Sequence, residues 1–249
     1  MARRILVVGG AGAIGRAYGA KAMAQGDLVA TLDLQTSITQ AGMEGHDLVF
    51  PIDVSDPASI ADAFARLGEA WDVADALIYL SGYTLSPPRP AEDVTEREWT
   101  GVIDVNLSGA FRVAMASLPL LRAGAGGSIV LVSSAMAFGP VKGFAPYIAS
   151  KAGMIGLTRS LALELAPAIR VNALAPSAME TPFAAGGTGR SDPNASADWF
   201  APEAFIPTIP LGRLAQVDDC LGTLDYLVGQ DSAFMTGQVL HINGGRQMR

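Results

Sequence analysis

A glycine-rich turn near the start of the chain stands between an apolar segment and a helix pattern. Residues 3–8 end in four apolar residues that fit a buried strand, and residues 16–25 have the composition of a helix that stops at Gly26. Between them, Gly10, Gly12 and Gly15 have Gly-x-Gly-x-x-Gly spacing, which allows a tight turn and a close backbone approach to a pyrophosphate. We therefore expect a dinucleotide-binding unit whose helix N-terminus faces the anion.

A carboxylate ends the next predicted strand. Asp33 follows the apolar residues 28–32 and lies about 20 residues beyond the glycines, where a carboxylate binds the ribose hydroxyls of a dinucleotide. Residues 34–42 contain no Arg or Lys to hold a 2′-phosphate, so the pattern favours NAD over NADP. The alternative is that Asp33 is an ordinary turn residue at the end of a strand.

Strand and helix patterns alternate along the rest of the chain. Predicted strands cover residues 3–8, 28–32, 49–52, 74–80, 128–133, 169–174 and 237–242, and predicted helices include residues 16–25, 95–115, 146–165 and 217–228. This alternation indicates an α/β fold, a Rossmann-type doubly wound parallel sheet of about seven strands with helices on both faces. With 249 residues and no repeat or linker, we expect one domain spanning residues 1–249.

Composition excludes several classes of protein. The net charge is −7 and no basic cluster occurs, which argues against partners such as nucleic acids or anionic membranes. The only cysteine, Cys220, lies in a predicted helix and is expected to be a buried hydrophobe. His46 and His241 have no neighbours at ligand spacing, so no metal site is expected. No apolar run reaches membrane-spanning length, and we predict a cytoplasmic protein.

Tyr147 and Lys151 have the spacing of two residues on one face of a helix. A nearby ammonium lowers the pKa of a phenol, which could then act as a general acid or base. Ser134, after the apolar residues 128–133, could donate a hydrogen bond to the same substrate oxygen. Alone, the pair could also be an ordinary half-exposed helical pair, and the functional interpretation depends on the rest of the chain.

Taken together, these motifs resemble those of the short-chain dehydrogenase/reductase family over nearly the full length, in its common single-domain branch. The matching stretches are residues 9–15, Asp53-Val54, Asn106 in Asp-Val-Asn-Leu, Ser134, Tyr147-x-x-x-Lys151, Arg170-Val-Asn-Ala with Pro176, Pro210-Leu-Gly-Arg, Thr236-Gly-Gln and Asn243-Gly-Gly. The resemblance implies a hydride transfer between a nicotinamide and an alcohol or ketone.

The resemblance also implies a role for each matched residue. Tyr147 would exchange the substrate proton, Lys151 would lower the pKa of Tyr147 and bind the nicotinamide ribose, Ser134 would polarise the carbonyl, and Asn106 would hold a water linked to Lys151. The cofactor residues would be Gly9, Gly12, Ala13, Ile14, Gly15, Asp33, Leu34, Asp53, Val54, Gly82, Tyr147, Lys151, Pro176, Ala178 and Thr181. For Asp53 the alternative is a turn before the next helix.

The chain departs from the family pattern at three places. Ala13 replaces a glycine in the first turn, residues 79–82 read Tyr-Leu-Ser-Gly instead of Asn-Asn-Ala-Gly, and Ser177 follows Pro176 where a glycine is usual. The second change removes side-chain hydrogen bonds expected to brace the sheet. The four catalytic positions are unchanged.

Residues 183–207 are expected to form a substrate lid, because they show no clear periodicity and follow a predicted strand end. Apolar residues expected in the substrate pocket are Met136, Phe138, Phe144, Met179, Phe183 and Trp199. For each of them, ordinary packing or a subunit contact is an equal alternative. Apart from the possible exceptions Lys142 and Arg190, no Arg or Lys is positioned by the sequence to bind a carboxylate, so the predicted substrate is a neutral, fairly apolar secondary alcohol or ketone.

These observations predict an NAD-dependent alcohol dehydrogenase. The alternatives are an NADPH-dependent ketone or 3-oxoacyl reductase, which Asp33 disfavours, and a non-catalytic dinucleotide sensor, which the intact catalytic set disfavours. Family resemblance and the apolar residues 104–121 and 146–165 also lead us to expect a homo-oligomer, with a tetramer favoured.

Overall fold

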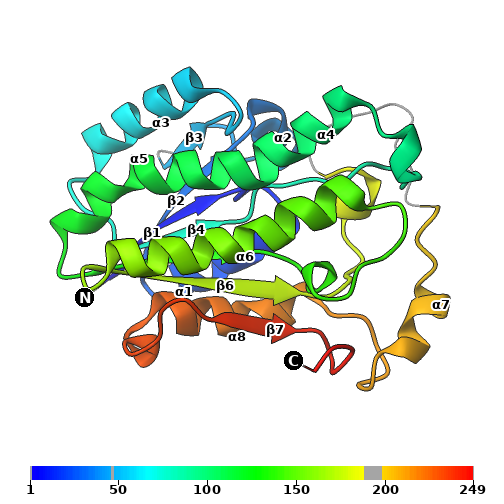
Figure 1. Ribbon diagram of the computed structural model, residues 1–249. Coiled ribbons are helices and arrows are strands. Elements are labelled where there is room, and N and C mark those ends of the chain that lie inside the picture. The colour runs from blue at the N-terminus through cyan, green and yellow to red at the C-terminus, as the bar shows by residue number, and fades with distance from the viewer. Residues whose placement is uncertain (1, 46–47, 188–197, 249) are drawn as a thin grey trace.

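The computed structural model describes residues 2–45, 48–187 and 198–248. Within them, seven parallel strands form one sheet in the order β3-β2-β1-β4-β5-β6-β7 (Figure 1). The strands are β1 Arg4–Val8, β2 Leu28–Asp33, β3 Val49–Pro51, β4 Ala76–Tyr79, β5 Gly127–Val132, β6 Ile169–Pro176 and β7 Val239–Ile242. The strand order reverses between β1 and β4, as in doubly wound dinucleotide-binding folds. The predicted fold class is confirmed.

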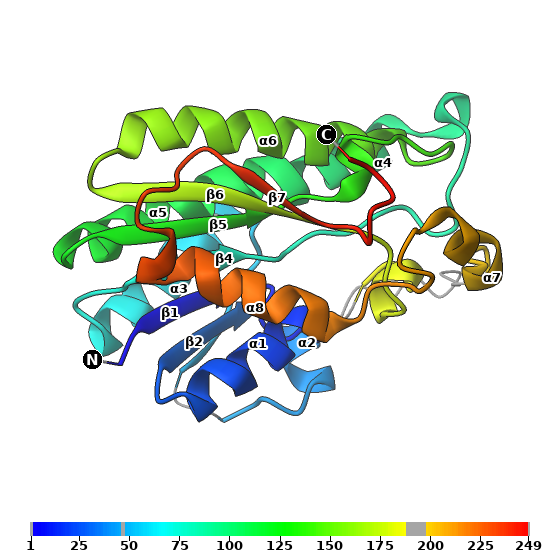
Figure 2. The same cartoon turned by 90° about the horizontal axis from the view of Figure 1, so that it is seen from below.

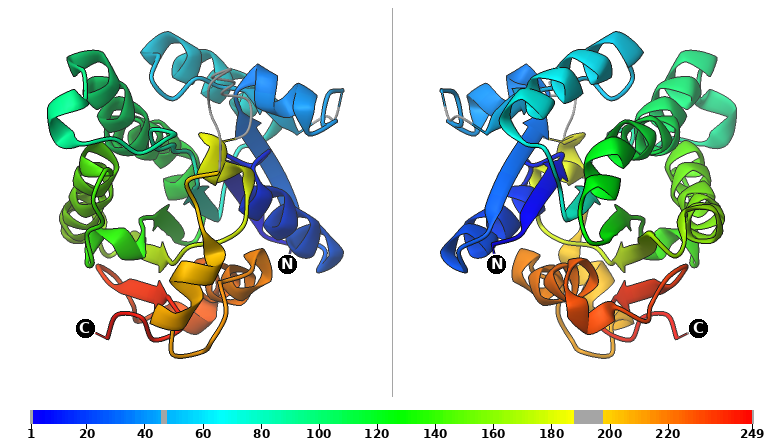
Figure 3. Two further views of the ribbon diagram at one scale, coloured as in Figure 1. Left: turned by 90° about the vertical axis from the view of Figure 1, so that its right-hand side faces the viewer. Right: turned by 90° about the vertical axis from the view of Figure 1, so that its left-hand side faces the viewer.

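Helices cover both faces of the sheet. They are α1 Ala13–Ala24, α2 Gln35–Gln40, α3 Pro57–Ala70, α4 Glu96–Ile103, α5 Gly109–Ala123, α6 Ala145–Leu165, α7 Pro202–Phe205 and α8 Val217–Val228. Short 3₁₀ turns lie at Ala91–Asp93, Ala135–Ala137, Pro182–Ala185, Ile206–Thr208 and Gln230–Ser232. Helices α3, α5 and α6 lie on one face, and α1 and α8 lie on the other (Figures 2 and 3). The helices α2 and α7 were not predicted from the sequence.

Alternating side chains of each strand fill two separate cores. Leu77 of β4 packs in the core under α3, α5 and α6, whereas its neighbour Ile78 packs in the core under α1 and α8. Both residues have no exposed surface. Because both faces are covered, these strands read as continuous apolar runs in the sequence.

The long helix predicted over residues 95–115 is interrupted. A π-helical turn, Asp104–Ser108, separates α4 from α5. The Tyr79 hydroxyl donates a 2.6 Å hydrogen bond to the carbonyl oxygen of Val105, and a Cβ on Gly109 would come within 2.8 Å of that hydroxyl. A side chain that takes a helix carbonyl competes with the main-chain N–H four residues on, which accounts for the altered turn.

Three further features of the described residues bear on function. None of their helices has the length and apolar character to cross a membrane. Within the same residues, no group of three or more His, Cys, Asp and Glu side chains is arranged to hold a metal ion. Cys220 is buried in α8, as expected, and burial raises the pKa of its thiol to about 12.

Candidate active site

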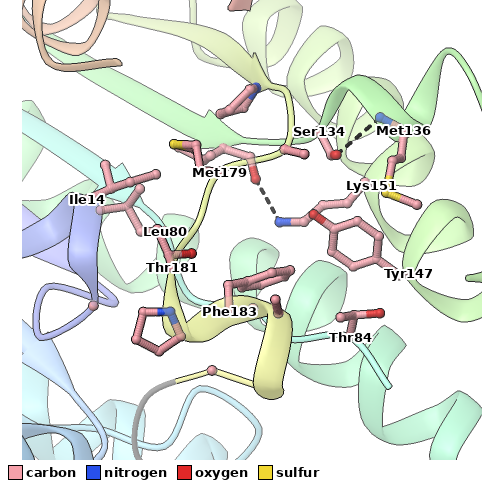
Figure 4. Close-up of a pocket in the computed structure, with 18 of the residues that line it drawn as sticks. Ile14, Leu80, Thr84, Ser134, Met136, Tyr147, Lys151, Met179, Thr181 and Phe183 are labelled. Carbon is pink, nitrogen blue, oxygen red and sulfur yellow. Dashed lines mark hydrogen bonds between the residues drawn. The ribbon is translucent and has the colours of Figure 1, made fainter. Parts of the chain in front are cut away.

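A cavity of about 680 Å³ lies at the carboxyl edge of the sheet, outside the ends of β1, β2, β4, β5 and β6 (Figure 4). In doubly wound folds, ligands bind at this edge. Every residue expected to bind cofactor or substrate lines the cavity except two, Asn106 and Phe138. The fold thus brings together residues that are as far apart in the sequence as Gly9 and Trp199.

The glycine turn after β1 packs closely against its neighbours. Gly9 has a φ of +83°, and a Cβ there would lie 2.6 Å from the main-chain nitrogen of Ser81. A Cβ on Gly15 would lie 2.5 Å from the Cα of Gly10, so the start of α1 also needs a glycine. Gly12 is less confined, since its Cβ would meet only the Gly9 carbonyl oxygen, at 3.2 Å. Close packing therefore accounts for Gly9 and Gly15. Gly12 lines the cavity, where it has no side chain to occupy the space.

The polar groups left open in the cavity fit a dinucleotide. Helix α1 begins at Ala13, and no side chain in the described residues caps its N-terminus, so its first amides can bind a pyrophosphate. At the other end of the cavity wall, the Ser177 hydroxyl is buried and has no hydrogen-bond partner in the described part of the chain. These donors without a side-chain or hydroxyl partner in the described residues lie along the edge of the sheet where the pyrophosphate and nicotinamide ends of a dinucleotide would bind.

Asp33 lines the cavity and also braces the glycine turn. Its carboxylate accepts a hydrogen bond from the main-chain N–H of Ala11 at 2.9 Å and another from that of Leu34 at 2.8 Å. The carboxylate is thus held at the end of β2, beside the turn. The strand-end and cofactor interpretations of Asp33 are compatible in this geometry.

Asp53 likewise lines the cavity while forming a turn. Its carboxylate accepts from the Ser55 N–H at 2.9 Å and from the Ser55 hydroxyl at 2.6 Å. Its own N–H donates to the Ser59 hydroxyl in α3. The helix start itself is capped by Asp56, which accepts from the N–H of Ala58. Asp53 therefore shapes the loop on which Val54 borders the cavity.

Helix α6 presents Tyr147 and Lys151 to the cavity from one face, and Ser134 approaches from the end of β5 (Figure 4). All three side chains are buried. The Ser134 hydroxyl accepts a 3.1 Å hydrogen bond from the N–H of Met136, and the Lys151 Nζ donates a 2.7 Å bond to the carbonyl oxygen of Val132. The phenol, the amine and the hydroxyl thus lie in the wall of one cavity.

The pKa of Tyr147 differs from the expectation. Burial raises it to about 12, against the opposing effect of a hydrogen bond with Ser134, and burial lowers the pKa of Lys151 to about 7. The lysine Nζ lies 5.8 Å from the centre of the phenol ring. The expected lowering of the phenol pKa by Lys151 is thus absent here, because desolvation disfavours the charged form of both groups.

Asn106 lies behind the cavity wall and is fully buried. Its side chain accepts from the N–H of Tyr83 at 2.9 Å, donates to the carbonyl of Tyr83 at 3.0 Å and donates to the Ser150 hydroxyl at 3.0 Å. A Cβ on Gly82 would lie 3.1 Å from the Asn106 Oδ1 and 3.4 Å from the Lys151 Nζ. Asn106 thus joins the loop after β4 to α6, directly beside Lys151.

The apolar residues predicted for the pocket mostly gather around Tyr147. Met136, Phe144, Phe183 and Trp199 belong to one cluster with it. Met179 also lines the cavity but packs against the core under α1 and α8.

The prediction for Phe138 is wrong. Phe138 follows the 3₁₀ turn Ala135–Ala137, and its ring packs against His241 of β7 with a centroid distance of 4.5 Å.

The predicted lid is described only in part. Residues 188–197, with Arg190, lie outside the described residues. After these residues in the chain, the Nε1–H of Trp199 donates hydrogen bonds to the Ser86 hydroxyl at 3.2 Å and to the carbonyl oxygen of Ala184 at 3.1 Å. The first bond joins Trp199 to the loop after β4, and the second joins it to the 3₁₀ turn Pro182–Ala185. Lid movement stays a prediction.

Several cavity residues were missed in the sequence, among them Thr84 and Arg246. Arg246 follows the Asn243-Gly-Gly motif and has no spacing that points to a site near Tyr147. Only the fold brings the end of the chain to the cavity.

Comparison with known proteins agrees with this geometry. A family model described as enoyl-(acyl carrier protein) reductase matches residues 9–247. The chain belongs to the short-chain dehydrogenase/reductase family.

Relatives in the family resemble the chain in sequence and in structure. The 4-formylbenzenesulfonate dehydrogenase of Comamonas testosteroni is 34% identical over 254 residues, covering 98% of this chain and 97% of that protein. The human dehydrogenase/reductase SDR family member 4 is 37% identical over 158 residues, which cover 63% of this chain but only 54% of that protein. A 3-ketoacyl-(acyl carrier protein) reductase from Brucella melitensis, solved in complex with NADH, has a TM-score of 0.86 at 27% identity and covers 99% of this chain and 98% of that chain.

Two departures from the family pattern have structural counterparts. Tyr79 stands in place of the first residue of the usual Asn-Asn-Ala-Gly, and its hydroxyl ties β4 to Val105. This bond braces the sheet against the helix in place of the side-chain hydrogen bonds that the usual asparagines would make. Ser177, in place of the usual glycine, adds its unpartnered hydroxyl to the cavity.

Proposed function

We propose that the protein interconverts a secondary alcohol and a ketone with NAD as cofactor, and that Tyr147 is its general acid and base. The observation that carries this proposal is the convergence of Ser134, Tyr147 and Lys151 in one cavity with the glycine turn. Bound nicotinamide would accept the hydride in oxidation and donate it in reduction. Membership of an oxidoreductase family supports the reaction class.

The proposed proton path runs through the phenol. In reduction, Tyr147 donates its proton to the carbonyl oxygen, and Ser134 donates a hydrogen bond to the same oxygen. A phenol whose pKa is about 12 is protonated at neutral pH and therefore ready to act as the acid. In oxidation, the phenolate accepts the alcohol proton, and Lys151, 5.8 Å from the ring centre, stabilises that charge.

The preference for NAD rests on Asp33. Its carboxylate lines the cavity at the end of β2 and would accept bonds from ribose hydroxyls while repelling a 2′-phosphate. The residues proposed to hold the pyrophosphate are Gly12, Ala13 and Ile14, with Pro176, Ala178 and Thr181 at the nicotinamide end.

The substrate is proposed to have an apolar, aromatic body, because Phe144, Phe183 and Trp199 surround Tyr147. The name of the relative from Comamonas testosteroni also refers to an aromatic carbonyl compound.

The test follows the absorbance of reduced nicotinamide with NAD or NADP and a panel of aromatic secondary alcohols, with Tyr147→Phe as the matched control. NAD-dependent turnover that falls by about 10²–10⁴-fold in Tyr147→Phe is expected for loss of a general acid or base. Turnover that survives in Tyr147→Phe would refute the role of the phenol. NADH binding without turnover on any alcohol or ketone would instead favour a dinucleotide sensor.

A second candidate is the reduction of 3-oxoacyl thioesters. It is favoured by the likeness to the 3-ketoacyl-(acyl carrier protein) reductase from Brucella melitensis. Acetoacetyl thioesters offered with NADH and NADPH separate the two candidates, since this alternative expects faster turnover than with any aromatic ketone.

We also propose a homo-oligomer, with a tetramer favoured, in the cytoplasm. Phe111 on α5 and Leu163 on α6 expose 47% and 84% of their surface, which suits an interface between copies of the chain. Light scattering coupled to gel filtration measures the oligomeric state directly.

A further inference from the structure

Arg246 reaches the cavity from a tightly held C-terminal turn. Asn243 accepts from the N–H of Gly245 at 3.0 Å and donates to the carbonyl of Gln247 at 2.8 Å, while the Arg246 N–H donates to the carbonyl of Asn243. Leu211 also donates its N–H to the carbonyl of Gly244. The main chain on both sides of Arg246 is therefore fixed before any ligand binds.

The Arg246 side chain is half-buried and keeps most of its donors free. Its guanidinium carbon lies 3.9 Å from the centre of the Phe205 ring, and Nε donates to the Thr208 hydroxyl at 3.1 Å. No carboxylate of the described residues lies within ion-pair distance of it, in contrast to Arg213, which pairs with Asp219. The Nη groups are thus available to a ligand, in the fork geometry that matches an oxyanion.

Charge is divided along the cavity. The carboxylates in its wall are Asp33, the last residue of β2, and Asp53, which follows β3 at one edge of the sheet. Besides Lys151, the cations in its wall are Lys142, on the loop before α6, and Arg246, after β7 at the opposite edge. An anionic ligand group would be repelled at the first end and attracted at the second.

A row of aromatic rings connects the catalytic helix with Arg246. Phe144 lies 5.3 Å from Trp199 between ring centres, Trp199 lies 5.8 Å from Phe200, and Phe200 lies 6.1 Å from Phe205, on which Arg246 stacks. All of these residues line the cavity. The wall between Tyr147 and Arg246 is thus suited to an apolar or aromatic body rather than to a polar chain.

We propose that Arg246 is an anion-binding residue of the substrate site and that the substrate is an aromatic alcohol or ketone bearing a carboxylate or sulfonate. This inference rests on the proposed function and changes the substrate expected from the sequence, which was neutral. Lys142, exposed at the cavity wall on the loop before α6, adds a further positive charge to the wall.

The test compares matched ketones that differ only in charge. The probes are 4-acetylbenzoate and the longer 4-(4-acetylphenyl)butanoate, each beside its neutral amide, assayed with NADH. Wild-type protein is expected to prefer at least one acid over its amide by about tenfold or more in kcat/KM, as for a charge-assisted hydrogen bond. Arg246→Met is expected to lose this preference, because its kcat/KM should fall more on the acids than on the amides.

Controls separate the outcomes. Arg122→Met removes an exposed arginine in the last turn of α5 and is expected to keep the preference. Equal use of acids and amides by the wild type, or an equal loss on both in Arg246→Met, would overturn the inference.

A binding measurement keeps the inference testable without turnover. Calorimetry of the two acids and their amides, with wild type and Arg246→Met in the presence of NAD, is expected to show tighter binding of an acid only in the wild type. Turnover failure with this binding difference would refute the proposed reaction alone, whereas equal binding by both proteins would refute the role of Arg246.

Discussion

The amine of Lys151 lies 5.8 Å from the centre of the Tyr147 ring and donates its hydrogen bond to the carbonyl oxygen of Val132, 2.7 Å away. Both side chains are buried, and burial raises the pKa of Tyr147 and lowers the pKa of Lys151, so the neutral form of each is favoured. Near neutral pH, the phenol of Tyr147 is therefore uncharged and the amine of Lys151 is only partly protonated. A charge placed on either group would then be felt strongly by the other, because little water screens it.

Stability is expected to depend on pH through Lys151. Its pKa is about 7 in the folded protein and ordinarily 10.5, so between these values the unfolded chain carries a proton that the folded protein has released. Stability contributed by this group therefore rises with pH across that window and is lost as pH falls toward 7, by up to about 1.4 kcal/mol per pH unit.

Urea unfolding of the wild type and Lys151→Met at pH 7, 8 and 9 measures this slope. The difference in unfolding free energy between the two proteins should grow in favour of the wild type as pH rises. The control is Lys142→Met, at an exposed lysine, which should show no such trend. Parallel pH profiles for the wild type and Lys151→Met would contradict the buried, neutral state of Lys151.

Cofactor selectivity is expected to depend on Asp33. The variant Asp33→Ser with Leu34→Arg removes the carboxylate that repels a 2′-phosphate and places a cation beside it, so the preference for NAD over NADP should fall by about tenfold or more. Fluorescence titration gives both dissociation constants. Asp33→Asn alone keeps an acceptor oxygen for Ala11 or Leu34 and should show a smaller change in the same direction. An unchanged ratio in both variants would show that the preference is set elsewhere.

Asn106 is expected to matter for both stability and activity. Asn106→Ala removes the two hydrogen bonds that Asn106 makes with the part-buried N–H and carbonyl of Tyr83, at a cost of about 1–3 kcal/mol, and loosens the loop beside Lys151. The matched control is Asn172→Ala in β6, which loses bonds to Gln238 and Met235, residues that do not line the cavity. Both variants should unfold at lower urea, but only Asn106→Ala should also lower kcat. An equal kcat loss in both would show a merely structural effect.

Two glycines are expected to respond to alanine in opposite directions. Gly15→Ala places a methyl 2.5 Å from the Cα of Gly10, in backbone that cannot move aside, and should destabilise the protein and weaken dinucleotide binding. Gly68→Ala in α3 meets nothing within 4 Å and should stabilise the helix by about 0.5–1 kcal/mol. Thermal unfolding with and without NADH measures both effects. Stability unchanged by Gly15→Ala would show that the turn can relax.

Local patterns were enough to predict most elements of the fold. The glycine turn and the apolar runs of the strands each depend on neighbours within about ten residues, and the structure places β1, β2 and α6 within two residues of their expected ends. The π-helical turn could not be predicted in this way, because it depends on Tyr79, which lies 26 residues from Val105 in the chain.

The sequence by itself determined the family and the order of strands and helices along the chain, and it singled out Ser134, Tyr147 and Lys151 as candidates, because these depend on local patterns and on spacing within motifs. Only the tertiary structure decided how buried Tyr147 and Lys151 are, and hence the direction of their pKa shifts. It also decided that Arg246 lines the cavity and that Phe138 does not. Burial and long-range contacts are made by segments far apart in the chain, and no local spacing encodes them.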